Sequence, residues 1–312
     1  MNNKISISLN IDDAAPIVHV WYEHFNENPE HMTSYGEKIK ERIPNSFMKH
    51  FCGLVEKYDL RGKFSVVPLP GGKNPYDTPE GREWLKLLHE HLEGRFSFCP
   101  EMLTHHKAYD IENDCFLDLN EEQWAELQDT ESMTKYIEYA LRTLKSRGVT
   151  PTGVTSPWHF GRKHEEIYRE AISKAFYNVF GMKQAWYFLN PSETGFPELV
   201  LDKNGRRLYA LSRTETDYMW DTLESGRTDG KYISETADKY ITSDGKDGSL
   251  IRRLDAGGHP VIITHWQSLF SNGSETGLSI LAEVAGRISE HLSDRVEFVS
   301  YDEKLRRFLQ CK

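Results

Sequence analysis

The decisive stretch of this chain is Lys4-Ile-Ser-Ile-Ser-Leu-Asn-Ile-Asp-Asp-Ala-Ala-Pro16, which predicts a buried strand followed by a turn. The strand covers residues 4–11, and Asp12 and Asp13 stand at its carboxyl end. Neighbouring side chains at a strand end point in different directions, so one carboxylate could bind a metal ion while the other handles a proton. Active sites of α/β folds form at such strand ends. The alternative is an Asx-type turn without a chemical role.

Strand-like and helix-like segments alternate along the rest of the chain. Strands are expected at 4–11, 62–68, 95–99, 152–155, 184–189, 261–264 and 296–299, and helices at 45–58, from 78 onward, 120–147, 163–178, 276–291 and after 300. Repeated β-α units favour a parallel sheet, and this many favour one barrel domain over residues 1–312. An irregular insertion is expected around 190–248, with a hairpin at Lys203-Asn-Gly205. An open doubly wound sheet is the alternative, although no Gly-x-Gly-x-x-Gly or Walker-type loop follows any expected strand.

Composition and charge narrow the class of protein. The chain has 312 residues, 38% of them hydrophobic, which is ample for a large core. Its net charge is −10 and it has no basic block, so a nucleic-acid partner is not expected. The cysteines form no Cys-x-x-Cys motif, and no apolar run is long enough to cross a bilayer. We therefore expect a soluble, cytoplasmic protein with no membrane partner, and we leave open a leader that has been removed.

Polar residues recur where the expected strands end. They are Glu101-Met-Leu-Thr-His105-His106 after the third strand, Ser156-Pro-Trp-His159 after the fourth, and His265-Trp-Gln267 after the 261–264 strand. In a barrel these ends share one rim with Asp12 and Asp13, and that rim is where active sites form.

The order and character of these segments resemble the polysaccharide deacetylase family of carbohydrate esterases. The family's first motif is an Asp-Asp pair that ends strand one, as in Ile11-Asp12-Asp13, and its last is a strand ending in Leu-x-His, as in Val261-Ile-Ile-Thr-His265. The second motif has two metal-binding histidines four residues apart. Glu101 and His105 match it best, with glutamate in place of the first histidine, and registers starting at His105 or His106 are the alternatives.

The third family motif departs most from the pattern. Thr155-Ser-Pro157-Trp-His-Phe-Gly161 keeps a proline and a glycine, but it lacks the arginine that orients the catalytic aspartate in the family. The resemblance nevertheless spans nearly the whole chain in order. It implies a divergent member with a distorted (β/α)7-type, TIM-like barrel.

The resemblance also implies a metal-dependent hydrolase. Asp13, Glu101 and His105 would hold a divalent ion, with zinc expected first and cobalt, nickel or manganese as alternatives. Asp12 would take a proton from the attacking water, and His265 would give one to the leaving group. For Glu101 the alternative role is to start a helix, where carboxylates are favourable.

Aromatic residues beside this site would bind the substrate. Trp158, His159 and Trp266 are expected to contact it, with packing in a loop or in the core as the alternative. The stretch 217–220 is a further candidate for the pocket wall. Three histidines in the long loop after the first strand are expected to be solvated: His19, His24 and His31.

The function expected from the resemblance is removal of an acyl group, acetyl above all, from a carbohydrate-like amide or ester. The partner would be a small-molecule or oligosaccharide substrate, and the oligomeric state stays open. One alternative is a catalytically inactive barrel that acts as a binding module, which the missing histidine and arginine favour. Another is a glycosidase, which requires a second carboxylate facing Asp12.

Overall fold

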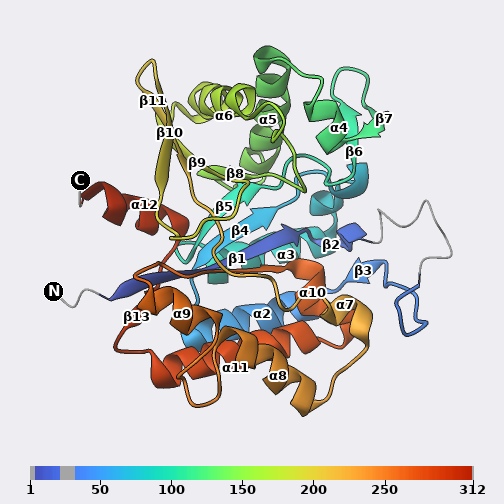
Figure 1. Cartoon of the computed structure of the whole chain (residues 1–312). Coiled ribbons are helices and arrows are strands. Elements are labelled where there is room, and N and C mark those ends of the chain that lie inside the picture. The colour runs from blue at the N-terminus through green and yellow to red at the C-terminus, as the bar shows by residue number, and fades with distance from the viewer. Residues whose placement is uncertain (1–3, 22–31, 311–312) are drawn as a thin grey trace.

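The computed structural model of the chain describes residues 4–21 and 32–310, and Figure 1 shows its strands surrounded by helices. The central strand is β1 (Ile5–Ala14), which is buried along almost its whole length because aliphatic and small residues alternate on it. Its parallel neighbours are β12 (Val261–His265) on one side and, on the other, β4 (Gly62–Val66) followed by β5 (Phe96–Pro100). The register places Asp12 opposite His265.

A second group of strands continues the ring. It contains β8 (Gly153–Thr155), β9 (Gln184–Phe188), β11 (Arg206–Ala210) and the outer β10 (Glu198–Lys203). β8, β9 and β11 are parallel, and β10 returns antiparallel to β11.

Backbone hydrogen bonds join the two groups of strands on both sides. Thr152 N–H donates to Phe98 O at 3.0 Å, which connects β8 to β5. On the far side, the N–H groups of Thr214 and Glu215 both donate to Val261 O at 3.2 Å, which connects the segment after β11 to β12. In the described residues, β1, β4, β5, β8, β9, β11 and β12 thus form a distorted (β/α)7-type barrel, as expected, rather than an open doubly wound sheet.

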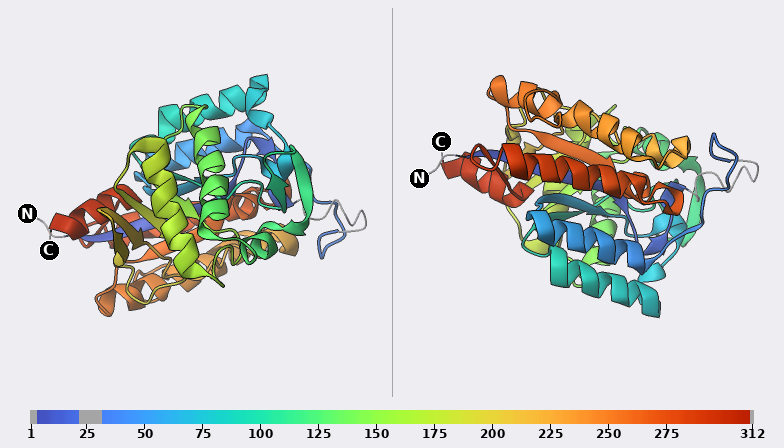
Figure 2. Two further views of the ribbon diagram at one scale, coloured as in Figure 1. Left: turned by 90° about the horizontal axis from the view of Figure 1, so that it is seen from above. Right: turned by 90° about the horizontal axis from the view of Figure 1, so that it is seen from below.

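Helices cover the outside of the barrel, as both views of Figure 2 show. α5 and α6 lie on one side of the strands in Figure 1, and α2, α8 and α11 lie on the other. The long helices are α2 (Asn45–Tyr58), α3 (Pro79–Leu92), α5 (Thr130–Lys145), α6 (Glu165–Phe180), α8 (Gly230–Tyr240), α11 (Thr276–His291) and α12 (Tyr301–Gln310). The shorter ones are α4 (Glu121–Ala125), α7 (Thr222–Ser225), α9 (Ser249–Asp255) and α10 (Trp266–Phe270). None of the helices formed by 4–21 and 32–310 has the length and hydropathy needed to cross a membrane.

Local sequence signals explain where several helices begin. Thr78 Oγ1 accepts the N–H of Gly81 at 3.0 Å and caps α3. Asn120 and Gln123 form the capping box that starts α4. The single helix expected over 120–147 is in fact two, because the Asp129 side chain accepts the N–H of Ser132 at 2.8 Å and starts α5 anew.

The stretch 190–248 contains the expected hairpin, formed by β10 and β11, and also two helices that were not expected, α7 and α8. The hairpin turns at Asn204 and Gly205, which both have positive φ as a type I′ turn requires.

The two ends of the barrel differ. At the amino-terminal end of the strands, α12 closes the barrel: Asn10 Nδ2 donates to the Tyr301 hydroxyl at 2.7 Å, and Trp186 packs edge-on against Tyr301. The short β13 (Val296–Phe298) pairs there with the start of β1. The carboxyl-terminal end is left for the loops that carry polar residues.

Candidate metal centre and active site

Three ligand-type side chains converge at the carboxyl end of β1 and β5. Asp13, Glu101 and His105 are each 3–5% exposed, and one ligand atom from each lies within 4.8 Å of the others. His105 Nε2 lies 2.8 Å from Asp13 Oδ1 and 3.9 Å from Glu101 Oε1. Two carboxylates and an imidazole are a set that binds divalent ions. Of the three possible registers of the second motif, the one that starts at Glu101 thus places both of its residues, Glu101 and His105, in this cluster.

Without a bound cation, the carboxylates of Asp13 and Glu101 repel each other, and protons compensate part of their charge. Burial, together with repulsion from Asp12 and Asp13, raises the pKa of Glu101 well above its usual value. Burial alone would lower the pKa of His105, but the Asp13 carboxylate raises it to about 10. Burial likewise favours protonation of Asp13, yet the positive His105 lowers the pKa of Asp13 well below its usual range. A divalent ion would replace the protons that hold the cluster together, so the donor set fits such an ion.

The backbone around the cluster adopts strained conformations. Asp13, His105 and Trp158 have φ of 65°, 55° and 48°, a region that residues with a Cβ rarely occupy. Such strain persists where surrounding contacts enforce it. Asp13 N–H donates to Glu101 Oε2 at 2.7 Å, and the Gln267 side-chain amide donates to Asp13 Oδ2.

A buried glutamate holds the loop that carries His105. Glu121 Oε1 accepts the N–H groups of Leu103 and Thr104, both at 3.0 Å, and Oε2 accepts that of His105 at 2.9 Å. The Tyr136 hydroxyl donates to the same carboxylate at 2.7 Å. This carboxylate thus fixes three consecutive backbone groups next to the imidazole.

Asp12 points toward a buried lysine. The Lys63 side chain is fully buried on β4, and its ammonium donates to Asp12 Oδ1, to Ser65 Oγ at 3.0 Å and to Thr155 Oγ1 at 2.7 Å. Ser65 Oγ also donates to Asp12 Oδ1 at 3.1 Å. Burial opposes the charge on Lys63, but the Asp12 carboxylate outweighs it and raises the lysine's pKa. Asp12 is therefore held by a cation, although no arginine follows β8 at the family's position.

His265 is paired with an aspartate across the same cavity. Its Nδ1 lies 2.7 Å from Asp217 Oδ2, and Trp220 packs edge-on against the imidazole. Burial would lower the pKa of His265, but the hydrogen bond with Asp217 and the charge of Asp13 raise it to about 9. The imidazole is thus protonated at neutral pH and can donate a proton from Nε2.

A cavity of about 650 Å³ opens over these groups. Its lining includes Asp12, the metal-type cluster and His265, together with the predicted substrate residues Trp158 and His159. Trp158 is 40% exposed and lies 5.0 Å from the His105 ring, measured between ring centroids. Trp220, in the stretch expected to form a pocket wall, also lines the cavity.

Two expectations about single residues are wrong. Trp266 does not line the cavity: it is fully buried at the start of α10, with its ring centroid 4.6 Å from Phe47 and 5.3 Å from Phe51. The residue before it is the last of β12, and the following helical turn directs Trp266 into the core. His19, expected to be solvated, is fully buried, and burial lowers its pKa to about 4. The positions of His24 and His31 lie outside the described residues.

Known proteins resemble this chain in structure but not detectably in sequence. No family model and no curated protein matches the sequence. A candidate polysaccharide deacetylase from Mycobacterium smegmatis shares 14% identity at a TM-score of 0.57, over 99% of this chain and 92% of that one. The chain has the polysaccharide deacetylase fold.

Two further solved structures are similar to this chain. A candidate cellobiose-phosphate cleavage protein from Enterococcus faecalis shares 11% identity at a TM-score of 0.50, over 96% of this chain and 99% of that one. A peptidoglycan deacetylase from Bacillus subtilis shares 9% identity at a TM-score of 0.45, over 99% of this chain and 94% of that one. The match to the Mycobacterium smegmatis structure confirms, at the level of the fold, the resemblance inferred from the motifs.

Three polar residues of the site were not predicted from the sequence in the roles that the structure gives them. Lys63 could have been noticed as a charge inside an otherwise uncharged strand, which is unusual unless the charge is paired. Glu121 gave no signal, because it lies in the first turn of a helix, where acidic residues are common. Asp217 lies in a stretch that was suspected only as a pocket wall, and nothing in the sequence connects it to His265.

Proposed function

We propose that this chain is a metal-dependent hydrolase that removes an acyl group, acetyl above all, from a carbohydrate-like amide or ester. The observation that carries the proposal is the convergence of Asp13, Glu101 and His105 in one cavity with Asp12 and His265. Proton carriers and metal-type ligands in one cavity are what hydrolysis of an acyl group requires.

The residues of the cavity suit separate steps of that reaction. Asp13, Glu101 and His105 would hold a divalent ion, which when bound polarises a carbonyl and acidifies water. Asp12, oriented by Lys63 and Ser65, would accept the proton of the attacking water. His265, kept protonated by Asp217, would donate a proton to the departing amine or alcohol.

The ligand set predicts a particular metal chemistry. Two carboxylates and one imidazole neutralise a divalent ion more fully than one carboxylate and two imidazoles would. Water at such a site is less acidic, so we expect slower turnover or a different preferred metal. Zinc, cobalt, nickel and manganese are the ions to compare.

The second candidate function is a catalytically inactive binding module with the same barrel. The glutamate at position 101 favours it, because a carboxylate in place of the family's first histidine changes the charge and the donor atoms that an ion would meet. The missing arginine no longer favours it, since Lys63 holds Asp12.

Metal content and acetate release separate the two candidates. The protein is purified without chelator, its metal is quantified, and hydrolysis of N- and O-acetylated oligosaccharides is measured with each added ion. We expect one ion per chain, loss of the ion in His105→Ala and Glu101→Ala, and no such loss in the control His106→Ala, because His106 is outside the cluster. A chain with no bound metal and no acetate release under any ion would refute the hydrolase and leave the binding module.

A further inference from the structure

Two arginines line the cavity without acidic partners. Arg162 lies in the loop after β8, is exposed, and its guanidinium makes no hydrogen bond or ion pair with any residue in the described ranges. Arg213 follows β11 and is half-buried; Nη1 donates to Glu215 O at 3.0 Å, and no carboxylate of residues 4–21 or 32–310 pairs with it. Arg213 is thus fixed in place while most of its donors stay available.

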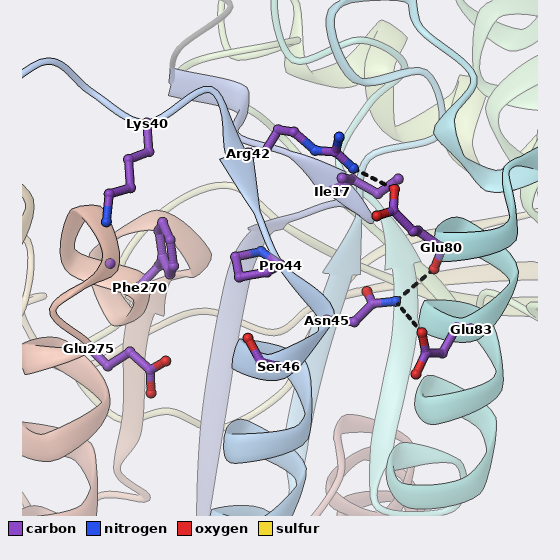
Figure 3. Close-up of a pocket in the computed structure, with 11 residues that line it drawn as sticks. Ile17, Lys40, Arg42, Pro44, Asn45, Ser46, Glu80, Glu83, Phe270 and Glu275 are labelled. Atoms are coloured by element: carbon purple, nitrogen blue, oxygen red, sulfur yellow. Dashed lines mark hydrogen bonds and ion pairs between the residues drawn. The ribbon is translucent and has the colours of Figure 1, made fainter.

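Most of the described arginines outside the cavity pair with carboxylates, and the exceptions are Arg82, Arg147 and Arg206. The hollow in Figure 3 is an example: Arg42 lines it and pairs with Glu80, and Asn45 Nδ2 donates to Glu80 O at 2.8 Å and to Glu83 Oε2 at 3.2 Å. Acidic residues are plentiful in a chain with a net charge of −10. The site cavity therefore holds two arginines without acidic partners, whereas most of the other described arginines have one.

The other charges of the cavity cancel within the site. Asp12 pairs with Lys63, and Asp217 pairs with His265. A divalent ion would neutralise the two carboxylates of the metal-type cluster. Asp221, exposed at the rim, is the acidic residue left to balance the arginines. With a divalent ion bound, the cavity would therefore keep an excess of positive charge from the guanidinium groups of the two arginines.

We propose that the substrate carries an anionic group, a phosphate or a carboxylate, in addition to its acyl group, and that Arg162 and Arg213 bind that anion. This inference rests on the proposed hydrolase function and specifies its substrate class. Guanidinium groups present planar, paired donors that match both anions, and charge-assisted bonds of this kind are the stronger ones. Trp158 and Trp220 also line the cavity and offer aromatic rings on which a sugar could pack.

Matched substrates test the proposal. Deacetylation rates are compared for an N-acetylated sugar, the same sugar with a phosphate, and the same sugar with a carboxylate. We expect the charged substrates to have the higher kcat/KM, and Arg162→Gln or Arg213→Gln to lower it about 10- to 100-fold for these alone. The control Lys163→Gln changes the neighbouring charge, which pairs with Glu126 at 2.7 Å outside the cavity, and should leave all three rates unchanged.

Equilibrium binding separates this inference from the proposed function. Affinities for inorganic phosphate and for the sugar phosphate are measured by calorimetry in wild type and both arginine variants. Weaker binding in the variants with no hydrolysis of any substrate would support the anion site and refute the hydrolase. Hydrolysis of neutral and anionic sugars at equal rates, with neither arginine variant altering rate or binding, would refute the anion site and support the hydrolase. A phosphate preference over carboxylate, or the reverse, identifies the anion.

Discussion

The pairing of Lys63 with Asp12 can be tested by Lys63→Met, which keeps the length of the side chain and removes its charge. The wild-type ammonium is fully buried and makes hydrogen bonds to Asp12, Ser65 and Thr155. In the variant, Asp12 keeps the hydroxyl of Ser65 but loses its only buried cation among the described residues.

The cost of this change follows from the burial of both partners. Breaking a buried ion pair by removing one partner costs about 3–5 kcal/mol, because the remaining charge is left without compensation. The free energy of unfolding should fall by this amount in urea denaturation. The rate near neutral pH should fall as well, because Asp12 loses the cation that orients it.

A double-mutant cycle distinguishes the pairing from simple loss of packing. Asp12→Asn alone leaves the lysine unpaired, whereas Lys63→Met with Asp12→Asn removes both charges. We expect the double variant to be more stable than the sum of the single losses predicts, by about 2 kcal/mol or more, while activity stays absent. Additive stability losses together with an unchanged rate in Lys63→Met would refute the pairing.

Three further predictions concern other buried polar groups. Asp217→Asn should move the alkaline limb of the pH–rate profile from about 9 toward the usual histidine value of 6.5, because His265 then loses its proton earlier as the pH rises; an unmoved limb in the rate assay would contradict its role as the acid. Glu121→Gln should weaken zinc binding about 10- to 100-fold in chelator competition, because an amide nitrogen cannot accept the loop N–H groups; unchanged affinity would show that the loop holds itself. Lys304 is buried without a hydrogen-bond partner among the described residues, and burial lowers its pKa from 10.5 to about 7. The unfolded chain binds more protons between these values, so stability rises with pH there, by up to about 1.4 kcal/mol per pH unit; Lys304→Met should remove this slope in denaturation series, and equal slopes would contradict it.

The parts of the fold that depend on local sequence were predictable. The alternation that marks β1, the caps at Thr78 and Asn120, and the Asn204-Gly205 turn all depend on neighbouring residues, and the structure contains each of them. The break between α4 and α5 was missed because the helical pattern continues across Asp129, whose capping side chain stops it.

The site was predictable where a residue lies at or just after the carboxyl end of a strand. Asp13, Glu101 and His265 could be placed because parallel strands end on one rim, whatever the rest of the packing does. The partners of these residues could not be placed. Lys63 lies three strand positions before the end of β4, and Asp217 reaches His265 from a segment 48 positions away along the chain. Trp266 was misplaced because a one-residue change from strand to helix decides whether it faces the cavity or the core.

The most direct test of the metal centre is diffraction from crystals grown with zinc, recorded on both sides of the zinc absorption edge. We predict one anomalous peak at ~2.0–2.2 Å from an oxygen of Asp13, an oxygen of Glu101 and a nitrogen of His105. A peak at another position, with these three side chains still paired among themselves, would contradict the account.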